Sequence, residues 1–111
     1  MRFDENGGVP RFMHDKKLLF SARELDDCLL APLEAIGIYV ERGAIDLGIA
    51  YEMFGSVVLE IWKYKPVQEY VVWLRKRDDD GWDLYDKLEI FYEKCVSYQD
   101  QKRKDTNGAF E

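Results

Sequence analysis

The sequence is poor in the residues that most often carry chemistry. Its 111 residues include one histidine, His14, and two cysteines, Cys28 and Cys95. The cysteines form neither a CxxC motif nor a zinc-ligand spacing, and there is no glycine-rich phosphate loop. His14, three residues after Arg11, lacks the surrounding pattern of a nucleophilic or ribonuclease site. We therefore expect no metal ion and no cofactor.

The sequence also has no excess of positive charge and no membrane-spanning run. The formal net charge is −6, from 22 acidic and 16 basic residues, which disfavours binding to phosphate backbones. Glutamates at positions 34, 52 and 60 interrupt the apolar stretches, and the polar first ten residues do not resemble a signal peptide. We expect a soluble cytoplasmic protein that binds no nucleic acid and keeps its thiols free and buried.

What the sequence does contain is a long apolar segment. Leu47 to Trp62, LGIAYEMFGSVVLEIW, carries charge only at Glu52 and Glu60, which share a narrow stripe with Ser56. A helix that is apolar on nearly every other side must be covered on nearly every side. We therefore expect this helix at the centre of a helical assembly.

Capping residues and periodic apolar positions predict the first helix. Ser21 and Glu24 form a capping box, Pro32 predicts a kink or a split, and Gly43 ends the helix. Its expected inward positions are Leu25, Leu29, Leu33, Ile36 and Val40.

Three further helices follow by the same reasoning. Asp46 caps the second helix, and Gly55 within it predicts close packing by a backbone or a large ring. Pro66 opens the third helix, and Asp83 caps the fourth. The inward positions expected for these helices are Ala50, Phe54, Val57 and Ile61, then Val67, Tyr70, Val71 and Leu74, then Leu84, Leu88, Phe91 and Cys95.

Together these segments predict an all-α fold in one domain. We expect a bundle of four principal antiparallel helices over residues 21–99, with the first helix kinked or split near Pro32. Residues 1–20 are expected to form an irregular N-terminal arm, and residues 100–111 a frayed polar tail. No stretch alternates between polar and apolar residues over a useful length.

Two acidic features invite a catalytic or metal-binding interpretation. The acidic loop around Gly81 fails as a calcium loop, because Lys76 and Lys87 fall at positions that require carboxylates. Glu52 and Glu60 lie about 12 Å apart along a helix, too far for a tight carboxylate pair. They are nonetheless the only candidates for a carboxylate-dependent hydrolase or nuclease.

Aromatic and basic residues near the third helix suggest an interaction surface instead. The aromatic candidates are Tyr64, Tyr70, Trp73 and Trp82, some of which fall outside the predicted inward positions. The basic candidates for contact with an anion or an acidic partner are Lys65, Arg75, Lys76 and Arg77. The alternatives are that the N-terminal arm covers the aromatic residues, and that the cations form a solvated helix end.

Residues 25–95 also resemble a known family. The features that carry the resemblance are Glu41-Arg42-Gly43, Ile45-Asp46, Phe54-Gly55, Trp62, Pro66, Arg75, Glu89 and Tyr92. They are similar to a bacterial helical family known as domain of unknown function forty-seven-sixty. The resemblance implies a helical fold and a bacterial or phage origin, and it brings no activity or site with it.

The sequence thus favours a non-enzymatic protein-interaction or regulatory module. Its partner would be another protein or a second copy of the chain, bound through the aromatic surface. The alternative, a small hydrolase or nuclease, would depend on Glu52 and Glu60.

Overall fold

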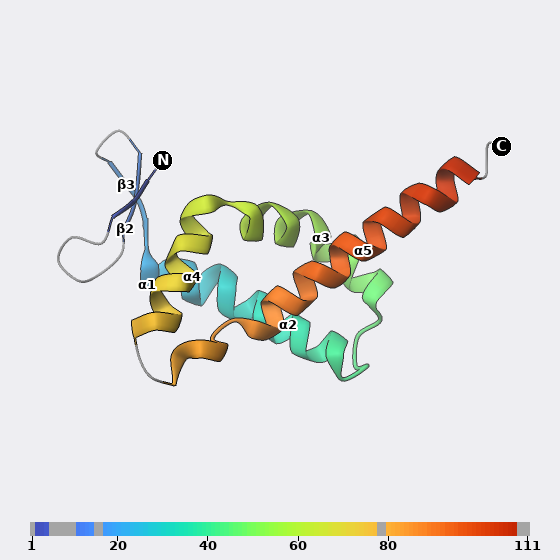
Figure 1. Ribbon diagram of the computed structural model, residues 1–111, viewed down its shortest axis with the longest axis horizontal. Helices are drawn as coiled ribbons and strands as arrows, with labels where there is room; N and C mark the ends of the chain where they lie inside the picture. Colours follow the sequence, from blue (N-terminus) through green and yellow to red (C-terminus); the bar gives the residue numbers. More distant parts are fainter. Residues whose placement is uncertain (1, 5–10, 15–16, 78–79, 109–111) are drawn as a thin grey trace.

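The computed structural model describes the backbone of residues 2–4, 11–14, 17–77 and 80–108, and the side chains of residues 21–77 and 80–105. Four principal helices pack together, which confirms the predicted all-α domain (Figure 1). They are α2 (Ala31–Glu41), α3 (Leu47–Lys63), α4 (Lys65–Arg77) and α5 (Asp86–Gly108). Helix α5 packs against both α2 and α3, and α4 turns away from the end of α3.

The N-terminal segment contains short strands that we did not expect. Its described parts form a three-stranded antiparallel sheet in the order β1-β2-β3 (β1, Arg2–Asp4; β2, Arg11–His14; β3, Lys17–Ser21). The register aligns Phe3, Phe12 and Phe20 in one row across the strands. Strands of three to five residues offer too few positions for a period of two to show in the sequence.

The first predicted helix is split just before Pro32, as expected. A short helix α1 (Ala22–Leu25) runs into a π-helical segment η2 (Asp26–Leu30), and α2 continues from it. Proline has no amide hydrogen to donate, so the regular hydrogen-bond ladder changes register around it. At the other ends of this unit, the Ser21 hydroxyl accepts from the Glu24 amide, and Gly43 closes the helix at φ +78°.

The side chains between the helices form one hydrophobic core. Burial of a large apolar side chain stabilises the fold by roughly 1.5–3 kcal/mol. The fully buried large side chains are Leu25, Leu30, Val58, Val67, Val71, Leu88, Phe91 and Cys95. Burial raises the pKa of the Cys95 thiol to about 11. Cys28 was expected to be buried and is exposed instead, and both thiols are free.

The buried face of α3 also differs from the prediction. Ala50 is buried as expected, but Val58 and Trp62 point inward where Val57 and Ile61 were predicted. Since the segment is apolar on nearly all sides, periodicity alone fits several faces, and packing against α5 selects one of them. Gly55 lies under the ring of Tyr51, which confirms the close packing expected there.

Helix α5 begins later and ends later than expected. It starts at Asp86, and Asp83 lies in a short 3₁₀ helix η3 (Gly81–Asp83), so Leu84 is exposed. The helix continues through Gly108, where a frayed tail was predicted from residue 100. Its distal half contacts α3 through the Tyr51 and Tyr98 rings, which are tilted relative to each other with centroids 4.8 Å apart. Among the described residues, no helix combines the length and apolar character that a membrane crossing requires.

Candidate functional site: an apolar stripe on α3

A line of apolar side chains on α3 is exposed to solvent. Ile49, Met53 and Val57 are 58%, 66% and 41% exposed. Their spacing of four residues places them in a row along one side of the helix. We call these three residues the α3 stripe. The prediction that α3 is covered on nearly all sides is therefore wrong for this side.

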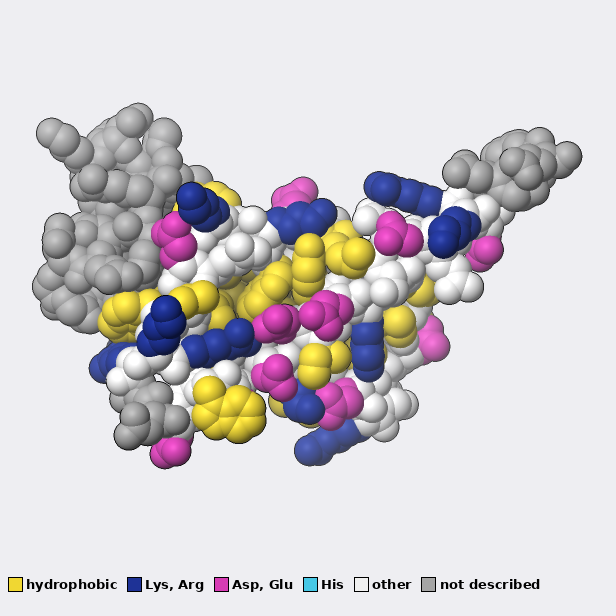
Figure 2. All heavy atoms as spheres, in the orientation of Figure 1, with side chains coloured by type: hydrophobic (Ala, Val, Ile, Leu, Met, Phe, Trp, Pro, Cys, Tyr) yellow, Lys and Arg dark blue, Asp and Glu magenta, His cyan; other side chains and the backbone are white. Residues whose placement is uncertain are grey.

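The α3 stripe lies beside acidic side chains. Asp46 at the start of the helix, Glu52 and Glu60 are all exposed, and Lys63 at its end is the one cation between Leu47 and Lys63. Glu52 pairs with Lys102 of α5 at 2.6 Å, and the Asp46 carboxylate accepts from the Ile49 amide at 3.2 Å. Figure 2 shows a band of hydrophobic side chains across the middle of the viewed face, with both acidic and basic side chains at its border.

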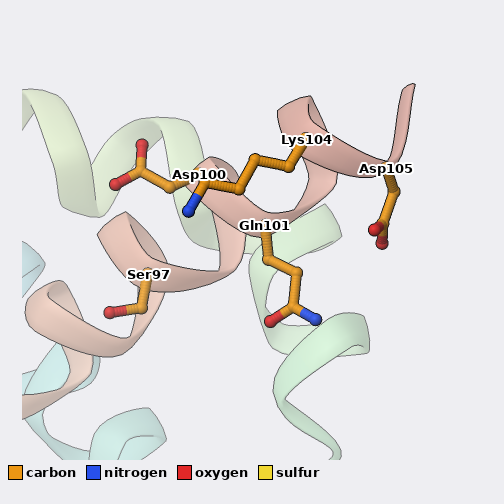
Figure 3. A pocket seen from close by; sticks show the side chains of 5 residues that line it. All are labelled: Ser97, Asp100, Gln101, Lys104 and Asp105. Atoms are coloured by element: carbon orange, nitrogen blue, oxygen red, sulfur yellow. The ribbon is translucent and has the colours of Figure 1, made fainter. Parts of the chain in front are cut away.

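Two hollows along α5 offer no enclosed site. The first, about 480 Å³, is lined by successive turns of α5 and opens to solvent (Figure 3). Its lining residues are Ser97, Asp100, Gln101, Lys104 and Asp105. The second, about 380 Å³, lies between α5 and Leu47 and is equally open. Neither hollow surrounds a small molecule as binding pockets usually do.

In contrast, a polar cluster holds the start of α5 in place. Asp26, in the π-helical segment, accepts hydrogen bonds from the hydroxyls of Tyr70 and Tyr85, each at 2.5 Å. Burial and the Asp26 carboxylate together raise the pKa of both tyrosine hydroxyls. One carboxylate therefore connects three separate parts of the chain.

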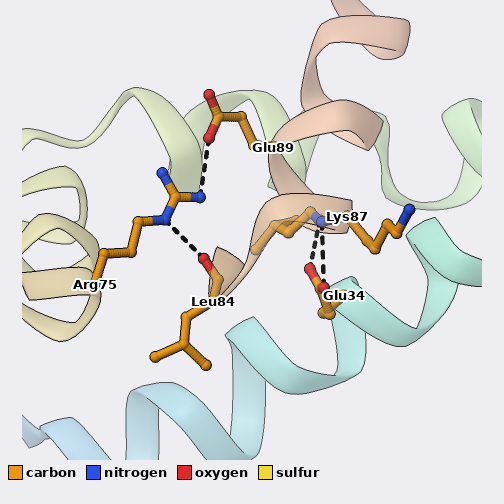
Figure 4. Close-up of polar contacts among 6 residues, drawn as sticks. Glu34, Arg75, Leu84, Lys87 and Glu89 are labelled. Atoms are coloured by element: carbon orange, nitrogen blue, oxygen red, sulfur yellow. Dashed lines mark hydrogen bonds and ion pairs between the residues drawn. The ribbon is translucent and has the colours of Figure 1, made fainter. Parts of the chain in front are cut away.

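Glu34 of α2 caps α5 from a neighbouring helix. Its two carboxylate oxygens accept from the backbone amides of Lys87, at 3.2 Å, and of Leu88 (Figure 4). Burial raises the pKa of the Glu34 carboxyl, and the two amide hydrogen bonds partly offset that rise. These amides belong to the first turn of α5, which has no intrahelical acceptors for them.

Arg75 completes the cluster from α4. Its guanidinium donates to the Leu84 carbonyl at 2.8 Å and to Glu89 at 3.0 Å (Figure 4). These contacts flank Tyr85, which has φ +59°, an unfavourable value for a bulky residue. Among the described residues, no buried side-chain nitrogen or oxygen lacks a partner. The cluster thus fixes a strained turn and leaves no group directed at a ligand.

The four predicted aromatic residues do not form a common exposed surface. Tyr70 is buried, and its ring stacks on half-buried Trp73 with centroids 6.1 Å apart. Tyr64 is half-buried in the one-residue connection between α3 and α4, where burial raises the pKa of its hydroxyl. Only Trp82, on η3, is largely exposed, at 73%.

The four predicted basic residues are likewise divided. Arg75 is engaged in the polar cluster, and the Arg77 guanidinium lies 5.2 Å above the Trp73 ring, a cation–π contact. Lys65 and Lys76 are exposed at opposite ends of α4. The structure does not gather these cations around one point, and contact with an anion stays a prediction.

The catalytic candidates lie on the open side of α3. Glu52 and Glu60 are exposed, and Glu52 is ion-paired with Lys102. Among the described residues, no group of three or more histidine, cysteine or acidic side chains is placed to hold a metal ion. The side chains of His14 and Arg11 lie outside the described residues.

Comparison with protein-family models, curated proteins and solved structures gave no match. The resemblance to the bacterial helical family therefore stays a prediction.

Sequence reasoning missed the α3 stripe, although a signal for it was present. Glu52, Ser56 and Glu60 were recognised as one polar stripe of the helix. Helical spacing places Ile49 and Met53 among those residues, so a helix that exposes the polar stripe exposes these apolar side chains as well. Attention to the neighbours of the charged residues would have found the surface.

Proposed function

We propose that this protein is a non-enzymatic protein-interaction module that docks through the α3 stripe. The observation that supports the proposal is the exposure of Ile49, Met53 and Val57 in one row on a helix whose opposite side is anchored in the core. Single exposed apolar side chains are common, whereas aligned ones typically mark an interaction surface. The two free thiols suit a reducing compartment such as the cytoplasm.

The α3 stripe replaces the aromatic surface as the proposed contact region. Tyr70 and Trp73 pack against each other, and Tyr70 is tied to Asp26, so their exposure would require the bundle to open. The α3 stripe needs no such change, because its side chains already face solvent. Trp82 stands apart from the α3 stripe, on η3 before α5, where Leu84 is also exposed.

Site-specific photocross-linking tests this proposal. A photoreactive phenylalanine analogue at position 53 is expected to capture a discrete protein in cells of the native host. The same analogue at position 72 is the matched control, since Val72 is an exposed apolar residue of α4 rather than of α3. The captured protein is then purified and titrated against the wild type and Met53→Asp. Equal cross-linking at both positions, or equal affinity of both proteins, would contradict the proposal.

A further inference from the structure

From the charge around the α3 stripe we infer that its partner is a basic amphipathic helix rather than a second copy of the chain. The inference rests on the proposed docking role of the α3 stripe. It goes further by naming the chemistry of the partner: a row of apolar side chains four residues apart, flanked by lysine or arginine.

The helical form of the partner follows from the shape of the α3 stripe. Residues four apart form a ridge along the surface of a helix, and such ridges pack into the grooves of a second helix. Amphipathic helices bind partner surfaces with anchors at this spacing. Ile49, Met53 and Val57 span a little over two turns, which matches three anchors of a partner helix.

The basic character follows from what borders the α3 stripe. Three exposed carboxylates accompany it, from Asp46, Glu52 and Glu60, against two exposed cations, Lys63 at the end of the helix and Lys102 of α5. Glu52 is paired with Lys102, but that pair is itself exposed, and the whole chain has a net charge of −6. Complementary charge at the rim of an interface speeds association and excludes partners of the wrong sign.

The same charges disfavour pairing between two copies. An antiparallel alignment that places Met53 against Met53 of a second copy sets Ile49 against Val57. It also sets Glu60 of each copy against Asp46 of the other. A parallel alignment sets Glu52 and Glu60 against their own equivalents. Both of these alignments bring carboxylates together, which costs binding energy.

Two synthetic amphipathic peptides test the inference against the full-length protein. They share one row of leucines four residues apart and differ only in their flanking residues, lysine in one and glutamate in the other. A third peptide keeps the lysines and has alanine in place of leucine. Fluorescence anisotropy titrations at low and high salt give Kd for each peptide. We expect the lysine–leucine peptide to bind about tenfold or more tightly than the glutamate peptide, with the preference reduced at high salt.

Variants separate specific docking from general attraction to an acidic protein. Met53→Asp is expected to weaken the lysine–leucine peptide at least tenfold, whereas Val72→Asp, on α4, leaves its Kd within a factor of two. Glu60→Lys is expected to reduce the preference for lysine over glutamate. Similar Kd values for the leucine and alanine peptides, or for the lysine and glutamate peptides, would overturn the inference.

Light scattering over a concentration series distinguishes failure of the basic-helix inference from failure of the proposed docking function. A dimer that Met53→Asp dissociates would identify a second copy as the occupant, which overturns the basic-helix inference and leaves the proposed function standing. A cross-linked partner that requires Met53 but is not basic would likewise overturn the basic-helix inference and leave the proposed function standing. If no association of any kind depends on Met53, both the inference and the proposed function are wrong.

Discussion

The start of α5 and the outer side of α3 differ in whether their side chains have partners within the chain. At the start of α5, Asp26, Glu34 and Arg75 reach from three different elements, and their charged groups bond to partners within the chain. On the outer side of α3, Ile49 and Met53 are apolar and face solvent. The charged groups at the start of α5 therefore have bonding partners within the chain, whereas these apolar side chains of α3 face solvent.

This contrast indicates which region is structural and which is available to a partner. A polar group with all its hydrogen bonds made inside the chain gains little from an external ligand. An exposed apolar row gains from being covered, by about 25 cal/mol for each Å² removed from water. The polar cluster at the start of α5 thus stabilises the fold, and the α3 stripe is the proposed contact surface.

The largest expected effect comes from placing a charge on the buried side of α3. The same change on the exposed side is the comparison. Val58 is fully buried, so Val58→Asp should reduce the free energy of unfolding by more than about 4 kcal/mol and prevent stable folding. Met53→Asp, on the exposed side, should change it by less than about 0.5 kcal/mol. Urea denaturation followed by circular dichroism measures both. A large loss in Met53→Asp would mean that the α3 stripe contributes to the core.

The next effect concerns the cap that Glu34 provides. Glu34→Ala removes the acceptor for the Lys87 and Leu88 amides and should destabilise the protein by about 3 kcal/mol. Glu41→Ala, on the same helix, removes only an exposed ion pair with Lys87 and should leave stability unchanged within error. Chemical denaturation compares the two, and equal losses would show that the cap is not specific.

A smaller loss is expected where Gly37 of α2 packs against α5. A Cβ atom at Gly37 would lie 2.7 Å from the Lys87 carbonyl oxygen and 3.1 Å from the Phe91 Cβ. Gly37→Ala should therefore destabilise the protein by about 1–3 kcal/mol, although alanine is the better helix former. Thermal unfolding measures the change. Ala35→Gly reports the intrinsic helix preference at a neighbouring position, and a gain in stability for Gly37→Ala would exclude the close approach.

The smallest effect concerns the tyrosines bonded to Asp26. Tyr85→Phe removes one hydroxyl donor and should cost about 1 kcal/mol at neutral pH. The folded state raises the pKa of Tyr70 and Tyr85 above the ordinary value of about 10. Above that pH the unfolded chain binds fewer protons than the folded one, so stability is complete below about pH 10 and falls as the pH rises further.

Denaturation between pH 9 and 11.5 checks this dependence. Tyr85→Phe should reduce the alkaline loss of stability, because one raised pKa is removed. Tyr39→Phe is the matched control, because it removes a tyrosine hydroxyl from a half-exposed site on α2. Identical slopes in all three proteins would show that Tyr85 ionises equally easily in both states.

The local rules of helix formation were largely predictable from the sequence. The Ser21 and Asp46 caps, the Gly43 terminus and the break near Pro32 all occur as expected. Each of these depends on a few neighbouring residues and on backbone geometry alone. The start of α5 was not predictable in this way, because its cap comes from Glu34, which lies 53 residues before Lys87 in the sequence.

The candidate site was only partly predictable for a related reason. The sequence identified the polar positions of α3, and it suggested an exposed aromatic surface near α4, where Tyr70 is in fact buried. It could not choose which apolar side of α3 is buried, since Val57 and Val58 are chemically equivalent choices. It also could not show that Tyr70 is withdrawn into the core by its hydrogen bond to Asp26.

By itself, then, the sequence determined the all-α class, most helix boundaries and the acidic balance of the chain, because these follow from local backbone preferences and composition. Only the tertiary structure decided which side of α3 faces solvent and how the turn into α5 is held. Both depend on contacts between residues far apart in the chain, and burial against α5 is what separates Val58 in the core from Met53 on the surface.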